Sequence, residues 1–423
     1  MKKLAIIITH PIQYYVPVFR LMAQQCKLKV FYTWGVAGMV PKHDPGFGKT
    51  IAWDLPMLDG YDYELLENIS ANPGSHHGKG IINPDIISKI EEFSPNAILI
   101  YGYIYDSHLK AMRHFKGKIP IWFRGDSTLL GEQFGFKAIA KKLYLKWVYS
   151  HVDKAFYVGT NNKAYFKKYG LKEKQLVFAP HAVDNKRFAE DRKAESNDLR
   201  ESLGVANEDI LILFAGKLEP NKNPELLLDA FIAWNKEQQA KNKELKCEIS
   251  PRNLVEMTAE KGMSSNKKVH LLFVGNGVLQ ESLKLKAQVF NAEIASYLAM
   301  TNSIHFMDFQ NQTQMPVVYQ ACNIYCLPSK SETWGLAVNE AMAVGKAIIV
   351  SDKVGCAIDL VQDGINGYIF RSNDMKDLTE KLNLLFNHSN LLADFRKQSQ
   401  QLIKNWGFEH QVEQFITTLN ATN

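Results

Sequence analysis

The stretch that decides the fold reads Leu327-Pro328-Ser329-Lys330-Ser331-Glu332-Thr333-Trp334-Gly335-Leu336-Ala337-Val338-Asn339-Glu340-Ala341-Met342-Ala343. A buried apolar strand ends at its start and a helix begins near Gly335. The residues between them therefore form a loop at the carboxyl edge of a parallel sheet, where open α/β sheets bind ligands. The free N–H groups at 335–337 and the positive end of the helix dipole favour an anion.

Two carboxylates accompany this loop. Glu340 lies about a turn and a half inside the helix, near its cleft side, where it can accept hydrogen bonds from two ribose hydroxyls. Glu332, on the loop, reaches a different part of the same ligand. Taken singly, each has a simpler interpretation: Glu332 as a carboxylate at a helix N-terminus, and Glu340 as a solvated side chain.

Outward from this stretch, short apolar runs alternate with helical patterns, as expected of strands buried on both faces. The first half predicts a helix at 84–93, begun by Asn83 and Pro84, and strands at 4–9, 28–34, 97–102, 119–124, 154–158 and 176–179. The second half predicts strands at 210–215, 268–274, 303–306, 323–327, 347–350 and 368–370, with helices near 223–235, 277–290, 312–320, 335–344, 356–362 and 375–386.

This alternation predicts an α/β chain with two doubly wound, Rossmann-like domains that face each other across a cleft. The polar, unpatterned residues 180–196 predict a linker, and the lysine-rich stretch 236–267 predicts a surface insertion. We therefore expect an N-terminal domain at 1–185, a C-terminal domain at 186–390 and final helices at 391–423 that pack back across both.

Composition agrees with a folded soluble protein: 46% of the 423 residues are apolar and 22% are charged. No apolar run approaches the roughly 18 residues that span a bilayer. The apolar stretch after Lys2 and Lys3 ends at Thr9-His10-Pro11 without a cleavage site, so we expect a cytoplasmic location. Five scattered cysteines and the lack of a His-Glu-x-x-His motif predict no metal site.

Two glycine-containing motifs are incomplete. Gly46-Phe47-Gly48-Lys49-Thr50 ends like a phosphate-binding loop, but His43 occupies the position of the first glycine. Gly275-Asn276-Gly277 follows a strand, but Gln280 replaces the third glycine of a dinucleotide fingerprint. Neither a nucleotide kinase nor a dehydrogenase is supported.

The basic surplus lies in the N-terminal half. Residues 137–174 hold ten lysines against Asp153 and Glu173, interleaved with aromatic residues. Ile139, Leu143 and Trp147 recur at a spacing of four, which predicts one helical face. Either this face docks on an anionic membrane surface carrying a lipid-linked acceptor, or it packs the helix on the sheet and leaves the lysines solvated. Nucleic acid is not expected, because no nucleic-acid-binding module accompanies the charge.

Glu332 and Glu340 together resemble the Glu-x7-Glu motif of the retaining glycosyltransferases of family 4, which have the GT-B fold. Further segments match that family in the same order along most of the chain. They are the polysaccharide-assembly-like Thr9–Tyr14 and Arg124–Ser127, the interdomain Pro180–Phe188, and the donor-domain loops Gly216–Asn223, Val274–Gly277, Gly355–Val361 and Asp363–Gly367.

The resemblance implies transfer of a sugar, with retention, from a nucleoside-diphosphate sugar to an acceptor hydroxyl of a glycan or a polyprenyl-linked glycan. No cofactor or metal is expected beyond this co-substrate. Glu332, Lys217 and Lys222 are the expected catalytic residues, and the expected donor-binding set is Gly216, Lys217, Lys222, Glu332, Thr333, Trp334, Gly335, Leu336 and Glu340.

The N-terminal side departs from the family pattern. His10-Pro11-Ile12-Gln13 stands where many members have a glycine-rich loop, and Arg124-Gly125-Asp126 stands where others have a histidine. His10, Arg124 and Asp126 are candidates for the acceptor or the reacting centre, although Arg124 and Asp126 can equally form a structural ion pair. An epimerase or phosphorylase of the same fold, or a non-catalytic nucleotide-sugar-binding protein, remains an alternative.

Overall fold

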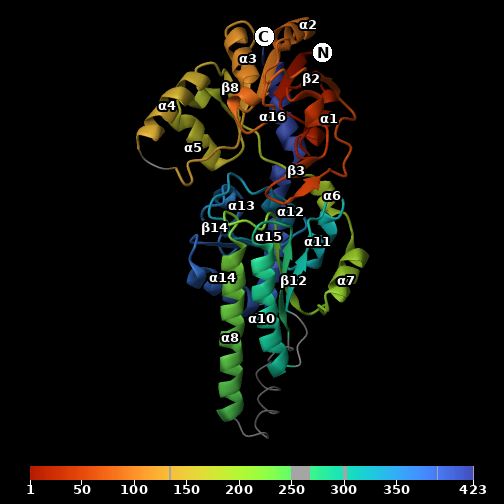
Figure 1. The fold of residues 1–423 in the computed structure, drawn as a ribbon, viewed down its shortest axis with the longest axis vertical. Coiled ribbons are helices and arrows are strands. Elements are labelled where there is room, and N and C mark those ends of the chain that lie inside the picture. The colour runs from red at the N-terminus through yellow and green to blue at the C-terminus, as the bar shows by residue number, and fades with distance from the viewer. Residues whose placement is uncertain (133–134, 249–266, 299–302, 388, 423) are drawn as a thin grey trace.

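Two parallel sheets, each covered by helices on both faces, make up the computed structural model of the chain (Figure 1). It describes residues 1–132, 135–248, 267–298, 303–387 and 389–422. The upper domain in Figure 1 is the N-terminal one, and the lower domain carries the second sheet. The α/β class and the two doubly wound domains predicted from the sequence are confirmed.

The N-terminal sheet has seven parallel strands in the order β5-β2-β1-β6-β7-β8-β9. They are β1 Lys3–Ile8, β2 Lys27–Tyr32, β5 Asp62–Leu65, β6 Ala97–Tyr101, β7 Ile121–Arg124, β8 Lys154–Tyr157 and β9 Leu176–Phe178. Alternate residues of β1 enter two separate cores: Ala5 and Ile7 face one side, and Leu4, Ile6 and Ile8 face the other. The sheet is therefore buried on both faces, which explains its continuous apolar runs.

Helices cover both faces of this sheet. They are α1 Val16–Ala23, α2 Ile86–Phe93, α3 Asp106–Phe115, α4 Phe136–Tyr149 and α5 Thr160–Lys168, with short 3-10 turns η1 Gly35–Gly38, η2 Gly78–Gly80 and η3 Glu173–Gln175. An antiparallel hairpin, β3 Lys42–Asp44 and β4 Lys49–Ile51, stands apart from the sheet. It contains the incomplete phosphate-loop motif, which the structure shows to be a turn between two short strands.

The C-terminal sheet has six parallel strands in the order β12-β11-β10-β13-β14-β15. They are β10 Ile210–Ala215, β11 Val269–Val274, β12 Ile304–Met307, β13 Ile324–Leu327, β14 Ala347–Ser351 and β15 Gly367–Phe370. Its helices are α6 Asn185–Ala189, α7 Lys193–Ser202, α8 Pro224–Glu248, α10 Gln280–Leu298, α11 Met315–Ala321, α12 Leu336–Ala343, α13 Ala357–Leu360, α14 Met375–Asn387 and α15 Ser389–Leu402.

The chain then returns to the N-terminal domain. After the turn η4 Ile403–Trp406, the helix α16 Phe408–Asn420 packs on α1. Its apolar face, Phe408, Val412, Phe415 and Leu419, is part of the N-terminal core. Figure 1 accordingly shows both chain ends in the upper domain.

Several sequence predictions need correction. The helix predicted at 84–93 starts at Ile86, because Asn83 is buried and donates its amide to carbonyls of Thr33 and Glu67 instead of capping. The predicted insertion at 236–267 is helical up to residue 248, as part of α8, and residues 249–266 lie outside the described part of the chain. The predicted linker 180–196 contains α6 and the start of α7.

No helix among the described residues has both the length and the apolarity to cross a membrane.

We expect Phe415→Ala to destabilise the N-terminal domain although residue 415 is remote from it in sequence. Phe415 is fully buried and its ring lies 4.5 Å from that of Phe156. Removing such a side chain costs about 3–5 kcal/mol. Urea unfolding followed by tryptophan fluorescence measures the change. Phe136→Ala, at an exposed phenylalanine, is the control and should change the free energy of unfolding by less than about 0.5 kcal/mol.

Candidate active site in the interdomain cleft

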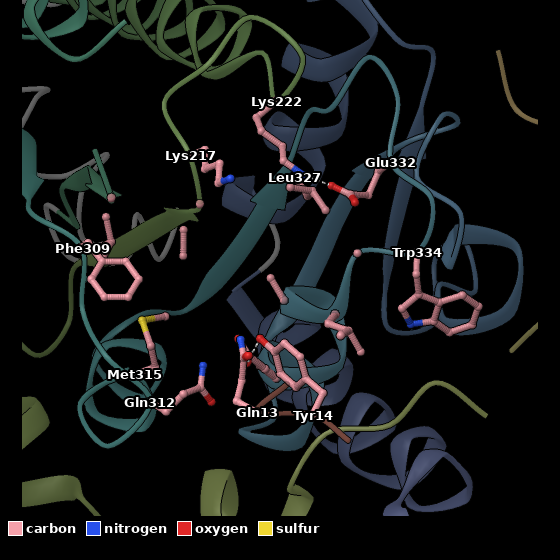
Figure 2. A pocket seen from close by; sticks show the side chains of 18 of the residues that line it. Gln13, Tyr14, Lys217, Lys222, Phe309, Gln312, Met315, Leu327, Glu332 and Trp334 are labelled. Carbon is pink, nitrogen blue, oxygen red and sulfur yellow. Dashed lines mark hydrogen bonds and ion pairs between the residues drawn. The ribbon is translucent and has the colours of Figure 1, made fainter. Parts of the chain in front are cut away.

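A cavity of about 470 Å³ lies between the two domains. Its walls include loops that follow strands at the carboxyl edges of both sheets. The N-terminal domain contributes Gln13 and Tyr14 after β1, Asp126 after β7 and His181 after β9. The C-terminal domain contributes the loops after β10, β11, β12 and β13. Figure 2 shows Lys217, Lys222 and Glu332 on one side of this cavity and Tyr14 across from them.

The loop after β13 turns into α12 through Gly335. This residue has a φ of 98°, in the left-handed region that favours glycine. The first-turn N–H groups of Leu336 and Ala337 have no intrahelical acceptor, and both residues line the cavity. The sequence prediction of an anion-binding helix N-terminus is therefore compatible with the local geometry.

Gly216 and Gly275 bring two cavity loops together. A Cβ atom on Gly275 would lie only 2.0 Å from the carbonyl oxygen of Gly216, and the φ of Gly275 is 134°. Glycine at this position lets the loops after β10 and β11 pack backbone to backbone. The incomplete dinucleotide motif thus has a packing role that positions the loop carrying Lys217.

Glu340 is the most enclosed charged group of the cavity, with 4% of its surface exposed. Its Oε1 accepts a hydrogen bond of 2.9 Å from the Tyr14 hydroxyl, and its Oε2 accepts one of 2.8 Å from the Tyr319 hydroxyl. Burial raises the pKa of Glu340, and hydrogen bonds from Tyr319 and Tyr14 oppose that rise. The interpretation of Glu340 as a solvated side chain is wrong, because its carboxylate bridges the two domains.

Glu332 and Lys222 form an ion pair on the cavity wall (Figure 2). The two side chains expose only 16% and 22% of their surface. The backbone N–H of Glu332 donates to the carbonyl of Lys353, and the Lys330 N–H donates to the carbonyl of Asn221. The loops that carry the acid and the base are thus fixed to each other by backbone as well as by charge.

Lys217, the second predicted cation, contacts the N-terminal domain. Its Nζ lies 2.9 Å from Oδ1 of Asp44 and 5.2 Å from the ring centre of Phe47. Burial tends to raise the pKa of Asp44, but Lys217 and the N–H groups of Gly46 and Phe47 lower it below its usual value. A carboxylate therefore holds a cation that faces the cavity.

The three N-terminal candidates lie in different places. Arg124 is buried and its guanidinium donates to the carbonyl oxygens of Ala179 and Pro180, so it does not face the cavity. The interpretation of Arg124 as a reacting-centre residue is wrong, and so is the alternative of a direct ion pair with Asp126. Asp126 lines the cavity and accepts a 3.0 Å hydrogen bond from the Thr333 hydroxyl. His10 lines a neighbouring cavity in the N-terminal domain.

Trp334 plays a packing role in addition to lining the cavity wall. Its ring is buried against His181 and Trp406, and its indole N–H donates to Asn339. Asn339 in turn donates to the carbonyl of His181. This chain of contacts fixes α12 to the interdomain segment, and the indole N–H is not available to a ligand.

Sequence reasoning missed several residues that line this cavity: Gln13, Tyr14, Phe47, Trp53, Phe309, Gln312, Met315 and Tyr319. Four of these residues come shortly after predicted strands: Gln13, Tyr14, Phe309 and Gln312. Ligands of open α/β sheets bind beyond the carboxyl ends of the strands, so this position could have identified them. Phe47 and Trp53 lie on or beside the hairpin, for which no buried strand pattern exists. Tyr319 is inside a helix and offers no signal.

Among the side chains that the structure describes, no group of three or more histidine, cysteine, aspartate or glutamate residues is arranged to hold a metal ion.

Residues 195–402 match the family profile described as "Glycosyl transferases group 1". The matched stretch covers just under half of the chain and lies within the C-terminal part. A curated relative, the D-inositol 3-phosphate glycosyltransferase of Salinispora arenicola, is 24% identical over 233 residues. The alignment covers 54% of this chain and 46% of that protein, so the chain spans less than half of its length.

Solved structures extend the similarity to the whole chain. The structure of Alr3699/HepE from Anabaena in complex with UDP has a TM-score of 0.68 at 16% identity, with all of both chains covered. The structure of WaaG, a glycosyltransferase involved in lipopolysaccharide biosynthesis, has a TM-score of 0.61 at 12% identity, with 98% of this chain and 99% of that chain covered. These similarities confirm the GT-B fold predicted from the sequence.

We expect Tyr14→Phe to lower stability, and to do so more at pH 8 than at pH 5. The lost hydroxyl donates to the ionised form of Glu340, a contact worth about 1.5–3 kcal/mol. Burial raises the pKa of Glu340 in the folded protein, so its ionisation lowers stability as the pH rises above the unfolded-state pKa. The Tyr14 hydroxyl reduces this loss by donating to the charged carboxylate. Tyr14→Phe removes that hydroxyl, so its effect is larger at the higher pH.

Chemical unfolding at the two pH values measures the difference. Tyr101→Phe is the matched control, because the Tyr101 hydroxyl is buried without a hydrogen-bond partner in the described part of the chain. A loss of stability for Tyr14→Phe that is independent of pH would contradict the role assigned to the Glu340 charge.

Proposed function

We propose that the protein is a retaining glycosyltransferase that moves a sugar from a nucleoside-diphosphate sugar to a hydroxyl of a glycan or lipid-linked glycan in cell-surface polysaccharide synthesis. One observation carries the proposal. Lys217, Lys222 and the N-terminus of α12 surround a single cavity that also contains the acidic pair Glu332 and Glu340. Structures of the same fold with UDP or UDP-glucose bound make uridine diphosphate sugars the first donors to test.

In this proposal the donor binds the C-terminal domain, residues 186–390. The diphosphate lies against the N–H groups at 335–337, beside Lys217 and Lys222, and Gly216 allows the backbone to approach. Because these groups are already positioned, they stabilise the negative charge that develops on the leaving diphosphate without reorganisation. No divalent metal is required for that task.

The two carboxylates have different tasks. Glu340 accepts hydrogen bonds from the ribose, in exchange for the Tyr14 hydroxyl that it binds in this structure. Glu332 lies near the donor sugar. We assign no covalent nucleophile: the acceptor hydroxyl attacks the face from which the diphosphate leaves, and a phosphate oxygen takes its proton. Asp126 lines the cavity from the N-terminal domain, and in this proposal it contacts the donor sugar or the acceptor.

The acceptor binds the N-terminal domain, residues 1–185. A second cavity of about 640 Å³ lies there, with His10, Trp34 and Met57 in its wall. Phe47 and Trp53 line both cavities, so the two are neighbours through these rings. Aromatic and apolar walls with a few polar groups suit a neutral sugar ring. Closure about residues 180–190 excludes water and limits donor hydrolysis.

We expect Lys222→Ala to lower the rate of sugar transfer roughly ten- to a hundredfold, because it removes a charge-assisted contact worth about 1.5–3 kcal/mol. The measurement is acceptor-dependent release of nucleoside diphosphate from a panel of UDP- and GDP-sugars. Lys330→Ala, at an exposed lysine of the neighbouring loop, is the control and should retain full activity. Unchanged activity of Lys222→Ala, or activity abolished by EDTA, would contradict the proposed chemistry.

The same assay distinguishes sugar transfer from the alternative functions. Donor conversion without any acceptor would indicate an epimerase, and dependence on inorganic phosphate would indicate a phosphorylase. Binding of a nucleotide sugar without turnover by any acceptor would indicate a non-catalytic binding protein.

We further place the protein at the cytoplasmic face of an anionic membrane through α4. Ile139, Leu143 and Trp147 expose 58%, 66% and 43% of their surface, and Phe136 at the start of the helix exposes 92%. The helix packs on the domain through Leu145, Val148 and Tyr149 instead. The predicted apolar stripe thus faces outward. An amphipathic face with lysines beside it is suited to an anionic lipid surface.

We expect binding to anionic vesicles and not to neutral ones, weakened by salt. Each lysine near the surface contributes about 1 kcal/mol, so reversing Lys142 and Lys146 should release the protein. Lys141 is a weaker site for reversal, because it is 3.4 Å from Glu132 and lies over the rings of Tyr165 and Tyr169. Vesicle co-sedimentation is the measurement, and equal pelleting with both kinds of vesicle would exclude this docking surface.

A further inference from the structure

Residues 42–54, here called the cleft strap, belong to the N-terminal half of the chain but contact the C-terminal domain. The strap comprises the β3–β4 hairpin and the three residues after it. It has a base, at residues 52–54, and a tip, at residues 44–47. Both ends contact loops that line the proposed donor cavity.

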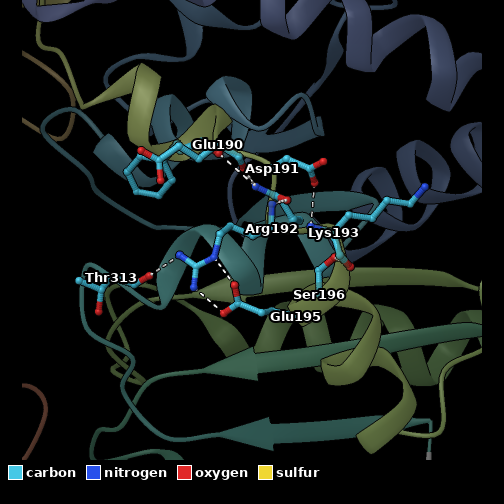
Figure 3. A network of polar contacts seen from close by, with 9 residues as sticks. Glu190, Asp191, Arg192, Lys193, Glu195, Ser196 and Thr313 are labelled. Atoms are coloured by element: carbon cyan, nitrogen blue, oxygen red, sulfur yellow. Dashed lines mark hydrogen bonds and ion pairs between the residues drawn. The ribbon is translucent and has the colours of Figure 1, made fainter.

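The base of the strap is fixed by hydrogen bonds to the loop after β12. The Asn311 side chain donates to the carbonyl of Ala52 over 2.6 Å, and the Thr313 N–H donates to Asp54 over 3.0 Å. Thr313 is itself held from the other side, because Arg192 donates to its carbonyl while also pairing with Glu195 (Figure 3). The base is therefore hydrogen-bonded to a loop of the C-terminal domain that Arg192 holds in place.

Aromatic packing continues from the base toward the tip. The ring of Phe309, from the C-terminal domain, lies 4.9 Å from Phe47 and 6.2 Å from Trp53. The Lys49 ammonium lies 5.8 Å from the same ring. Phe47, Trp53 and Phe309 all line the proposed donor cavity, so the strap forms part of its wall.

The tip of the strap holds Lys217 by charge. Asp44 Oδ1 lies 2.9 Å from Lys217 Nζ and also accepts the N–H groups of Gly46 and Phe47 at 2.8 and 3.2 Å. A Cβ on Gly46 would lie 2.5 Å from the Lys217 side chain, so glycine permits this close approach. The turn of the hairpin is thus built around the carboxylate that binds the cation.

We propose that Asp44 is an internal competitor for the diphosphate of the donor: its carboxylate occupies on Lys217 the place that a phosphate group takes when a nucleoside diphosphate binds. This inference rests on the proposed function of the cleft. Two anions that approach one ammonium group repel each other, so the phosphate displaces Asp44 and the tip moves away from Lys217. The base of the strap stays tied through Ala52 and Asp54.

Asp44→Asn tests this exchange with little change of shape. An asparagine oxygen can still accept the N–H groups of Gly46 and Phe47, so the hairpin turn is kept while the negative charge is lost. The ion pair is partly exposed, and such pairs contribute about 0.2–1 kcal/mol. We therefore expect Asp44→Asn to bind UDP more tightly than the wild type, by up to about fivefold, in titration calorimetry at fixed salt.

Asp54→Asn is the matched control. It removes the same charge from the same strap, but Asp54 contacts Thr313 and not Lys217. We expect no tightening of UDP binding by this variant. Tightening equal to that of Asp44→Asn would show a general charge effect and overturn the proposal.

A double-mutant cycle with Lys217→Ala completes the test. In the Lys217→Ala background, Asp44→Asn should change UDP affinity by less than about 1.5-fold, because the ammonium group for which Asp44 and the phosphate compete is absent. A retained gain, or unchanged or weaker UDP binding by Asp44→Asn alone, overturns the proposed competition. Failure of the wild type to bind either UDP or GDP would instead overturn the proposed donor site, and the competition with it.

Discussion

Strand direction is the constraint on which the rest of this structure depends. In a parallel sheet the carboxyl end of every strand lies at the same edge, so all loops that follow strands gather there. Here two such edges face each other. Loops after β1, β7 and β9 meet loops after β10, β11, β12 and β13 around one cavity. Residues separated by more than 300 positions, such as Tyr14 and Glu340, therefore come into hydrogen-bond contact.

The main charged groups of the cleft are paired with other side chains. Lys222 pairs with Glu332, Lys217 with Asp44, and Glu340 accepts two tyrosine hydroxyls. Such partners reduce the cost of keeping charged groups in a partly desolvated cavity. They also mean that a charged ligand must exchange partners when it binds. Two of these partners, Asp44 and Tyr14, come from the N-terminal domain, so these contacts also join the two domains.

The contacts that hold the domains together are distributed around the cleft. Helix α16 returns to the N-terminal core, and Asn339 and Trp334 fix α12 to the interdomain segment through His181. Elsewhere Thr160 donates to Asp359, and Asn161 donates to the carbonyl of Gly355. Burial lowers the pKa of His181 well below its usual value, so this residue is neutral among its aromatic neighbours. Its packing role does not depend on a charge.

The sequence by itself determined the strands, the α/β class and the C-terminal wall of the cavity. Buried parallel strands are continuous apolar runs, so each predicted strand occurs within two residues of its predicted ends. The loop and helix containing Glu332 and Glu340 could be placed because a strand end and a helix start are local signals. The edge strand β5, with its half-exposed Asp-Tyr-Glu-Leu sequence, gave no such run and was missed.

Only the tertiary structure decided which side chains meet across the cleft. Arg124 ends β7 two residues before Asp126, yet its side chain turns into the core, where it donates to the carbonyl oxygens of Ala179 and Pro180 just after β9. The sequence likewise could not decide whether Ile139, Leu143 and Trp147 are buried or exposed, because an apolar helical stripe can pack in a core or lie on an outer surface. The contacts of Asp44 with Lys217 and of Tyr14 with Glu340 depend on how two domains dock, and docking leaves no periodic pattern in sequence.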